Sequence, residues 1–229
     1  MLSLIGLGLD EKGYSMEAYD LISKSDKIYL ETYTVDFPYS IKSLEKQFKG
    51  KKFIKADREF VESLKILEEA KKQNVALLIY GSPLMATTHI SLIEEAKKRK
   101  IKFKIIYNAS ILDAVSETGL QIYKFGKIAS IPKHEASSFL KIISENEKIS
   151  AHSLVLVDIG LELNDALKKL GYIKEKILIC SQLGTENSKI FYGKISKLKK
   201  IKIKKPFCII IPGKLHFVEE EFLENFKDV

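Results

Sequence analysis

Short apolar runs alternate with longer amphipathic segments along the chain. The apolar runs predict strands, since four to six apolar or β-branched residues bounded by polar or turn residues are typical of buried strands. The predicted strands are Leu2–Ile5, Lys27–Leu30, Lys52–Ile54, Val75–Tyr80, Phe103–Ile106, Leu154–Val157, Lys176–Cys180 and Phe207–Ile211. The predicted helices are Ser15–Lys24, Ser40–Phe48, Glu59–Gln73, Thr88–Lys100, Glu135–Glu145, Asn164–Leu170 and Val218–Phe226. Repeated strand–helix–strand order predicts an α/β fold with a mainly parallel sheet and helices on its faces.

The segment Glu59–Gln73 shows the helical period well, with Phe60, Leu64, Leu67 and Ala70 on one stripe. The pattern is regular up to about residue 107 and then changes. Residues 117–135 mix glycine, lysine and β-formers without a clear helix, and a second α/β set follows from about residue 137. We therefore expect two α/β domains, 1–110 and 111–229, packed without a long linker.

The composition is that of a globular protein with a sizeable core, since 45% of the residues are hydrophobic and 30% are charged. No run approaches the roughly 18 to 20 apolar residues that cross a bilayer. The opening MLSLIGLGLD reads as a first strand, so we expect a cytoplasmic protein. Cys180 and Cys208 lie in apolar runs and are expected to be buried, reduced thiols. Only four scattered histidines accompany them, which does not favour a metal site.

The formal net charge of +8 could indicate an anionic partner. Lysines are spread along the chain, however, and alternate with isoleucine in 101–104 and 201–204. This alternation predicts buried isoleucines and solvated lysines, so we do not expect nucleic-acid binding.

Glycines and small polar residues follow several predicted strands. Gly6 and Gly8 follow the first strand, where open α/β sheets bind ligands, but Glu11 stands where a dinucleotide fingerprint needs a third glycine. The segment 80–89, YGSPLMATTH, is either a ligand loop or a strand-to-helix turn in which Thr87 or Thr88 caps the helix. Ser110 could cap the next helix, contact a ligand, or both. A lone histidine such as His216 is more often structural than functional.

Hydrolytic and phosphoryl-transfer signatures are absent from the sequence: no HExxH, no GxxxxGK[ST], and no recognisable Ser-His-Asp or Cys-His set. A reaction between a pre-activated donor and an already nucleophilic acceptor needs none of these groups. We therefore assign no catalytic residue.

These segments, in this order, resemble the diphthine synthase family of tetrapyrrole methylase-like (class III) methyltransferases. The most specific pieces are PLMATTH (83–89), TGLQIYKFG (118–126) and PGKLH (212–216), and the resemblance covers nearly the whole chain. It implies two α/β domains with a ligand cleft between them, a homodimer, and S-adenosyl-L-methionine as cofactor with S-adenosyl-L-homocysteine as product. It also implies methylation of the amino group of 3-amino-3-carboxypropyl-histidine on translation elongation factor 2, within diphthamide biosynthesis.

Matching motif to motif, the resemblance places cofactor contacts on residues of both predicted domains. They are Leu9, Ser82, Met85, Ser110, Ile111, Val157, Leu183 and His216.

One departure concerns Ser82, because the family usually has Gly-Asp-Pro where this chain has Gly81-Ser82-Pro83. Replacing a charged acceptor by a hydroxyl weakens a hydrogen bond to a cationic ligand by on the order of 1 kcal/mol. Three alternatives to diphthine synthase therefore stay open. They are a sister class III enzyme acting on a tetrapyrrole or ribosomal RNA, a degenerate cofactor-binding module without turnover, and a basic RNA-binding protein.

Overall fold

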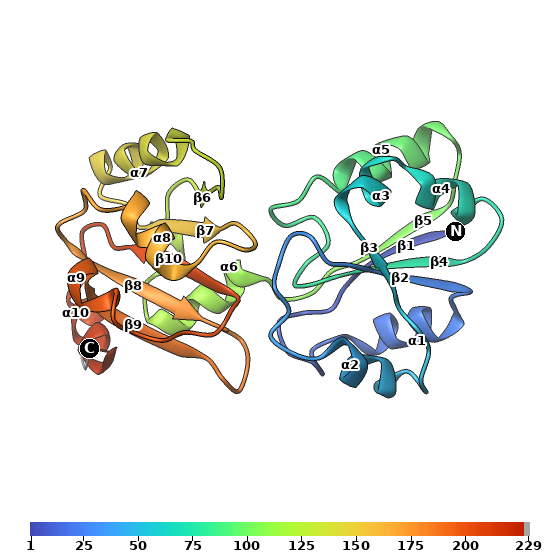
Figure 1. The fold of residues 1–229 in the computed structure, drawn as a ribbon, viewed down its shortest axis with the longest axis horizontal. Helices are drawn as coiled ribbons and strands as arrows, with labels where there is room; N and C mark the ends of the chain where they lie inside the picture. Colours follow the sequence, from blue (N-terminus) through green and yellow to red (C-terminus); the bar gives the residue numbers. More distant parts are fainter. Residues whose placement is uncertain (227–229) are drawn as a thin grey trace. The chain divides into compact units, whose positions relative to one another are not determined.

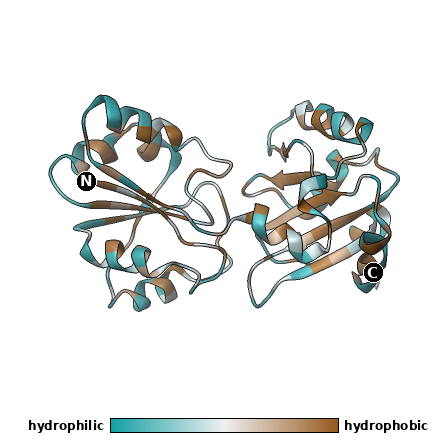
Figure 2. Ribbon diagram, turned by 180° about the vertical axis from the view of Figure 1, so that it is seen from behind, coloured by the Kyte–Doolittle hydropathy of each residue, from teal (hydrophilic) through white to brown (hydrophobic). Residues whose placement is uncertain are grey.

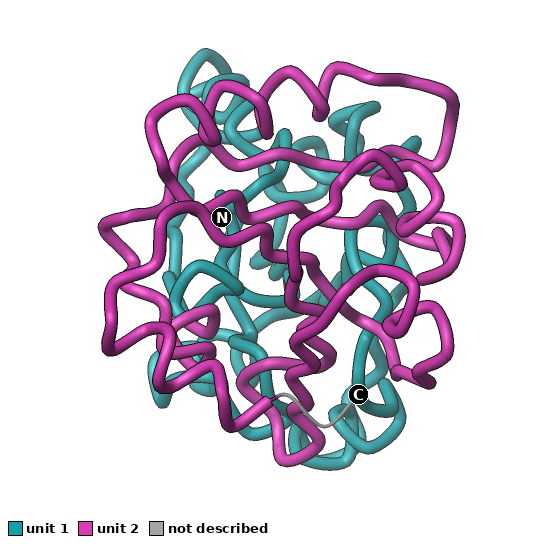
Figure 3. The backbone as a smooth tube through the Cα atoms, turned by 90° about the vertical axis from the view of Figure 1, so that its left-hand side faces the viewer, with its two compact units in different colours: residues 1–113 teal, residues 114–229 magenta. Residues whose placement is uncertain are grey.

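The structure is a computed structural model that describes residues 1–226. The chain forms two compact units, residues 1–113 and 114–229 (Figure 3). Each unit contains one five-stranded sheet with helices packed on it (Figure 1). The α/β fold expected from the alternation of apolar and amphipathic segments is confirmed.

Unit 1 contains a fully parallel sheet of order β3-β2-β4-β1-β5. Its strands are β1 (Leu2–Gly6), β2 (Lys27–Glu31), β3 (Ile54–Ala56), β4 (Val75–Ile79) and β5 (Phe103–Ile106). Its helices are α1 (Met16–Lys24), α2 (Ile41–Gln47), α3 (Arg58–Glu62), α4 (Lys65–Ala70), α5 (Ile90–Lys98) and α6 (Ile111–Ala114), which ends in unit 2.

Alternate residues of the central strands face opposite layers of helices. In β4, Leu77 belongs to the core beneath α3, α4 and α5, whereas Leu78 belongs to the core beneath α1 and α2. The strands are therefore hydrophobic on both faces, and the helices are hydrophobic only on the side toward the sheet (Figure 2). Each fully buried leucine contributes about 2 kcal/mol of transfer free energy.

Unit 2 contains a mixed sheet of order β6-β7-β10-β8-β9. Its strands are β6 (Ala129–Ile131), β7 (Ser153–Val157), β8 (Lys176–Ser181), β9 (Lys189–Lys194) and β10 (Phe207–Ile211). Its α-helices are α7 (Ser138–Lys148), α8 (Leu163–Lys169), α9 (Ile195–Leu198) and α10 (Phe217–Leu223), and its 3-10 helices are η1 (Val115–Thr118), η2 (Ile122–Lys124) and η3 (Glu224–Phe226).

The prediction of a mainly parallel sheet is wrong for unit 2. Only β6 and β7 pair in parallel, while β10 is antiparallel to β7 and β8, and β9 is antiparallel to β8. The connections explain the difference, because a parallel crossover needs about a dozen residues or more, usually in a helix. Only residues 182–188 join β8 to β9, so these two strands form a hairpin.

Several predicted elements change in detail. The helix predicted over 59–73 is two helices, α3 and α4, because Leu64 adopts a left-handed conformation with φ of 62°. The strand predicted at Lys52–Ile54 lies two residues later, as β3. Strands β6 and β9 were not predicted, and the strand-rich segment expected at 118–126 forms the 3-10 helices η1 and η2.

The two cysteines are buried and free, as predicted. They face each other across the pair formed by β8 and β10. The hydrogen bond with Cys208 and complete burial raise the pKa of the Cys180 thiol.

Candidate functional site

Three neighbouring strands of unit 1 end at the same edge of the sheet. Strands β4, β1 and β5 are adjacent and parallel, so the loops that follow them meet there. The loops are residues 7–15, 80–89 and 107–110. The carboxyl edge of a parallel sheet is the usual ligand site of open α/β folds.

A backbone bridge joins the first two loops. The Gly8 N–H donates to the Gly81 carbonyl at 3.1 Å, and the Gly81 N–H donates to the Gly8 carbonyl at 2.9 Å. Both glycines have φ of 73°, a conformation that other residues rarely adopt. A Cβ on Gly6 would lie 2.6 Å from the Gly81 carbonyl oxygen, so the loops approach each other too closely for a larger residue.

Asn108 attaches the third loop to the first. Its side-chain amide donates to the carbonyls of Gly6 at 3.1 Å and Gly13 at 3.0 Å. Tyr80 adds a further link from the second loop, because its hydroxyl donates to the Leu9 carbonyl at 3.0 Å. All three loops are therefore held in place by hydrogen bonds to backbone carbonyls.

The five predicted contact residues of unit 1 lie on these loops or directly after them. Leu9, Ser82 and Ser110 are buried, Ile111 is partly buried and Met85 is 36% exposed. Among residues 1–226 the Ser82 hydroxyl has no hydrogen-bond partner. It is available to a ligand.

Ser110 caps α6, as one of its two predicted roles required. Its hydroxyl accepts from the Leu112 N–H at 3.2 Å and donates to Asp113 at 3.0 Å, while Asp113 also accepts from the Ser110 N–H at 2.7 Å. These bonds fix the third loop at the start of α6.

The predicted cap of α5 is wrong, since His89 and not Thr87 or Thr88 precedes the helix and makes no capping bond. The fully buried His89 ring instead links Nδ1 to the Pro83 carbonyl at 3.0 Å and Nε2 to the Tyr33 hydroxyl at 3.2 Å. A carbonyl only accepts, so Nδ1 carries the proton and Tyr33 donates to Nε2. Burial raises the pKa of Tyr33 to about 12, which keeps this donor protonated.

An aromatic cluster of Phe37, Tyr39 and Tyr80 lies beside the first loop. The hydroxyl of Tyr39 is buried without a hydrogen-bond partner in the described part of the chain. Burial raises its pKa, so it remains a donor. Buried polar atoms without partners are rare in native proteins, and this one marks the same strand edge.

In unit 2, the mixed sheet separates the three predicted contact residues. Val157 ends β7 and Leu183 follows β8, and these strands run in the same direction. His216 follows β10, which runs the opposite way, so its strand ends at the other edge of the sheet. The sheet thus brings Val157 and Leu183 to one edge and His216 to the other.

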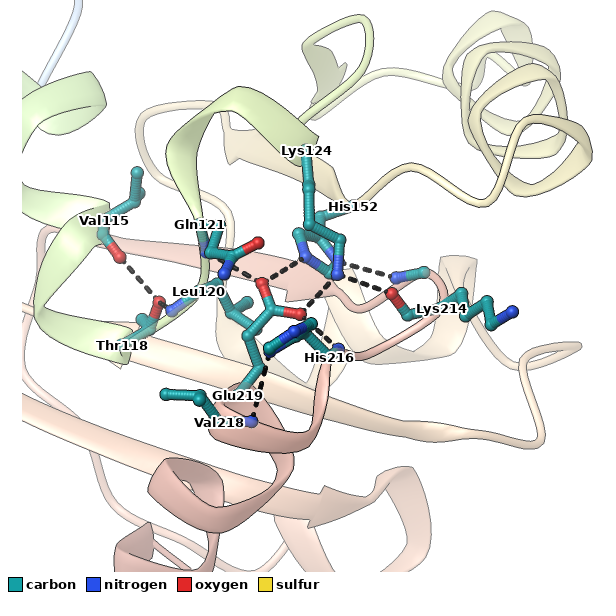
Figure 4. Close-up of polar contacts among 11 residues, drawn as sticks. Val115, Thr118, Leu120, Gln121, Lys124, His152, Lys214, His216, Val218 and Glu219 are labelled. Atoms are coloured by element: carbon teal, nitrogen blue, oxygen red, sulfur yellow. Dashed lines mark hydrogen bonds and ion pairs between the residues drawn. The ribbon is translucent and has the colours of Figure 1, made fainter.

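Glu219 lies at the centre of a buried network around His216 (Figure 4). Its carboxylate accepts from the Gln121 N–H at 2.8 Å, from the His216 N–H at 2.7 Å and from His152 Nε2 at 3.1 Å, and it pairs with Lys124. The network joins TGLQIYKFG to PGKLH, because Lys124 also donates to the Lys214 carbonyl at 2.7 Å.

The electrostatics of this network follow from its donors. Burial alone would raise the pKa of Glu219, but the hydrogen bonds from Lys124, the two backbone N–H groups and His152 lower it to about 2. Burial lowers the pKa of His152, whose Nδ1 accepts from the Gly213 N–H at 2.9 Å. His152 is therefore a neutral donor through Nε2. The exposed His216 ring accepts from the Val218 N–H at Nδ1, which leaves the Nε2 proton facing outward.

Glu117 links the same connecting segment to the Leu183 loop. Its carboxylate accepts from the Gly184 N–H at 2.7 Å and from the Ser188 hydroxyl at 2.6 Å. Residues 117–124 therefore hold both the Leu183 loop and the His216 loop, although these loops follow strands that end at opposite edges.

Sequence reasoning missed the residues that hold the loops, namely Asn108, Tyr80, Glu117, His152 and Glu219. One signal was available: a glutamate three residues after an N-cap is typical of a capping box, and Glu219 stands there relative to His216. The other four roles depend on contacts between segments far apart in the chain.

Two kinds of site are not found among residues 1–226. No group of three His, Cys, Asp or Glu side chains is arranged to hold a metal ion. No helix there is long and apolar enough to span a lipid bilayer.

The fold and the strand-edge loops define an α/β protein of the methylase class. The family model described as "Tetrapyrrole (Corrin/Porphyrin) Methylases" matches residues 1–199. The chain is therefore an S-adenosylmethionine-dependent methyltransferase.

Proteins named diphthine synthase match the chain over its whole length. The chain is 38% identical to that of Methanocaldococcus jannaschii and 36% identical to that of a Methanococcus maripaludis strain, each with 98% of both chains covered. It is 33% identical to "Probable diphthine methyl ester synthase" of Arabidopsis thaliana, with 99% of this chain and 98% of the relative covered. A solved diphthine synthase structure superposes with a TM-score of 0.92 at 32% identity, covering 99% of this chain and 96% of that one. Within the tetrapyrrole methylases, the chain belongs to the diphthine synthase family.

The strand-edge loops of unit 1 fit the methyl donor of this class. Gly6, Gly8 and Gly81 keep the backbone bare of side chains, and Ser82 offers a buried hydroxyl without a partner. An uncharged, backbone-lined edge suits a nucleoside with one compact cationic centre, because it leaves no buried cation to repel the sulfonium.

Replacing Gly119 by alanine tests the packing of TGLQIYKFG. Gly119 and Gly50 share φ of 75°, but a Cβ on Gly119 would overlap the Phe222 ring, whereas nothing lies within 4 Å of one on Gly50. Both changes cost about 1 kcal/mol of backbone strain. Gly119→Ala should lose a further 1 to 3 kcal/mol or so in urea unfolding. Equal losses would contradict the packing.

Replacing Glu219 by glutamine tests the buried network. Glu219→Gln leaves Lys124 without its counter-ion and should lower the free energy of unfolding by about 3 kcal/mol. The matched control, Glu220→Gln, removes an exposed charge from the same helix and should change it by less than about 0.5 kcal/mol.

The pH dependence of unfolding checks the sign. Because the folded pKa of Glu219 lies below its ordinary value of 4.5, its contribution is present above pH 4.5 and is lost as the pH falls toward about 2. Wild-type stability should fall more steeply than that of Glu219→Gln across this window. Parallel curves would rule out a low folded pKa.

Proposed function

We propose that this protein methylates the amino group of 3-amino-3-carboxypropyl-histidine on translation elongation factor 2, in diphthamide biosynthesis. Similarity to diphthine synthases over 98% of both chains carries the proposal. Binding of S-adenosylmethionine by Leu9, Ser82, Met85, Ser110 and Ile111 is part of it. So is a contribution to the same ligand from the second predicted domain, 111–229, through Val157, Leu183 and His216.

The chemistry needs positioning more than proton transfer. The bound cofactor supplies a methyl group that its sulfonium makes electrophilic. The chain has to orient the acceptor amine and exclude water, and good alignment is worth on the order of 7 kcal/mol or more. The hydrogen-bonded loops of unit 1 are suited to this because their backbone positions are already fixed. The amine loses its proton to solvent, since no side chain is assigned as a general base.

The relative named as a methyl ester synthase supports a second candidate product. The acceptor carries a carboxylate beside its amine, so a methyl group could be placed on oxygen as well as on nitrogen. We further propose that the protein is cytoplasmic and forms a homodimer, as the family resemblance implies.

Methylation of elongation factor 2 tests the proposed activity. The enzyme should transfer labelled methyl from S-adenosylmethionine to elongation factor carrying the precursor, and not to factor whose target histidine is replaced. Label that survives mild alkali would indicate N-methylation, whereas alkali-labile label would indicate the ester. No incorporation would contradict the proposal, and label on a tetrapyrrole or ribosomal RNA instead would reassign the substrate.

Restoring the family carboxylate tests the role of Ser82. Ser82→Asp should tighten binding of S-adenosylmethionine about fivefold, the equivalent of roughly 1 kcal/mol, because the charge strengthens a hydrogen bond to a cation. Ser91→Asp adds the same charge at an exposed position on α5 and should leave affinity unchanged. Calorimetry that shows no gain for Ser82→Asp would remove Ser82 from the ligand site.

A further inference from the structure

The net positive charge of the chain is concentrated in one segment. Residues 187–218 contain nine lysines, no arginine and no acidic residue. The rest of the chain has 29 basic and 30 acidic residues, a net charge of −1, so this segment accounts for the whole excess of +8. The even spread of lysines noted in the sequence therefore hides an uneven distribution of net charge.

Seven of these lysines form an exposed strip that we call the basic strip. They lie on β9, on α9 and on the extended residues that follow α9. They are Lys189, Lys194, Lys197, Lys199, Lys200, Lys202 and Lys204. The alternating Ile201 and Ile203 pack against the core of unit 2, which turns the lysines between them toward solvent.

The basic strip carries no neutralising partners. None of its seven lysines forms an ion pair with any described residue. Elsewhere such pairs are common: Lys27 pairs with Glu69, Lys71 with Glu68, and Arg99 with both Glu68 and Glu95. Seven unpaired like charges along one short segment repel each other and favour a polyanionic neighbour.

Protection of an open sheet edge explains only part of the strip. Strand β9 is an edge strand, and lysines on edge strands prevent pairing with other chains. Only Lys189 and Lys194 lie on β9. The other five lie beyond it, where they protect no edge.

Both ends of the basic strip lie at the carboxyl end of β8. Lys189 is paired with Ser181, and the Ser181 hydroxyl donates to the Lys204 carbonyl at 2.6 Å. Gln182 donates to the Lys205 carbonyl at the same distance. Leu183, a proposed cofactor contact, is the next residue. The strip therefore borders the proposed site.

We infer that the basic strip docks an acidic surface of the polypeptide substrate and guides it to the Leu183 edge. The inference rests on the proposed function, which supplies a protein as substrate. Carboxylates fit better than nucleic acid, because the strip has no arginine for bidentate phosphate contacts. It also lacks a free aromatic platform for bases, since Phe191 packs on the core and Tyr192 lies under Lys176.

Neutralisation of four strip lysines tests the inference. The variant Lys199→Gln, Lys200→Gln, Lys202→Gln and Lys204→Gln should raise the KM for precursor-bearing elongation factor about tenfold near physiological salt. Its kcat and its Kd for S-adenosylhomocysteine should stay at the wild-type values. The wild-type KM should rise with salt, and the variant should lose most of that dependence.

The control removes the same charge elsewhere. Lys24→Gln, Lys46→Gln, Lys65→Gln and Lys72→Gln change exposed lysines of unit 1 that form no ion pair, so both variants have equal net charge. The control should keep the wild-type KM. Thermal unfolding and cofactor affinity establish that both variants are folded.

Three results would overturn the inference. Equal KM values in the two variants, with normal turnover by the wild type, would remove the strip alone. Loss of binding to total RNA in the strip variant, with an unchanged KM for the protein, would assign the strip to nucleic acid. No turnover by the wild type would remove the proposed function and this inference with it.

Discussion

The close approach of two backbone loops, at Gly8 and Gly81, is the constraint on which the rest of the site depends. The two mutual hydrogen bonds extend the pairing of β1 and β4 beyond the ends of the strands. They require glycine, because both residues have positive φ and Gly6 lies against the Gly81 carbonyl. The loops that result have a fixed backbone and expose few side chains. Such an edge can bind a ligand without first paying to order itself.

Buried polar side chains attach the remaining loops in the same way. Asn108 holds the first loop of unit 1, His89 holds the carbonyl of Pro83, and Glu219 gathers four donors in unit 2. A buried carboxylate is costly unless its hydrogen bonds are complete, and here they are. The three most specific sequence motifs, PLMATTH, TGLQIYKFG and PGKLH, contain or contact these groups. Their specificity therefore reflects how the loops are held as well as what they bind.

Much of the fold could be predicted because strong apolar runs mark central strands. The limits of β5 and β10 match the predicted ones, and the family resemblance is confirmed by full-length relatives. The missed elements lack that signal: β6 has three residues, and β9 is a half-exposed edge strand with lysines at both ends. The break at Leu64 interrupts an otherwise regular helical stripe, so periodicity alone could not show it.

The candidate site was predictable only in part. Glycines and small residues after strands pointed to Leu9, Ser82 and Ser110, which the parallel sheet brings to one edge. The direction of β10 had no local signal, so the separation of His216 from Val157 and Leu183 could not be foreseen. The partners of Glu219 come from residues 121–216, a span that no local pattern covers.

Hydrogen exchange with and without S-adenosylhomocysteine tests the central claim most directly, because it reports each loop separately. The account predicts that the ligand slows amide exchange in peptides covering residues 7–13, 80–86 and 108–112, and leaves the helices α1 and α2 unchanged. Binding without slower exchange at the Gly8 and Gly81 loops would contradict it.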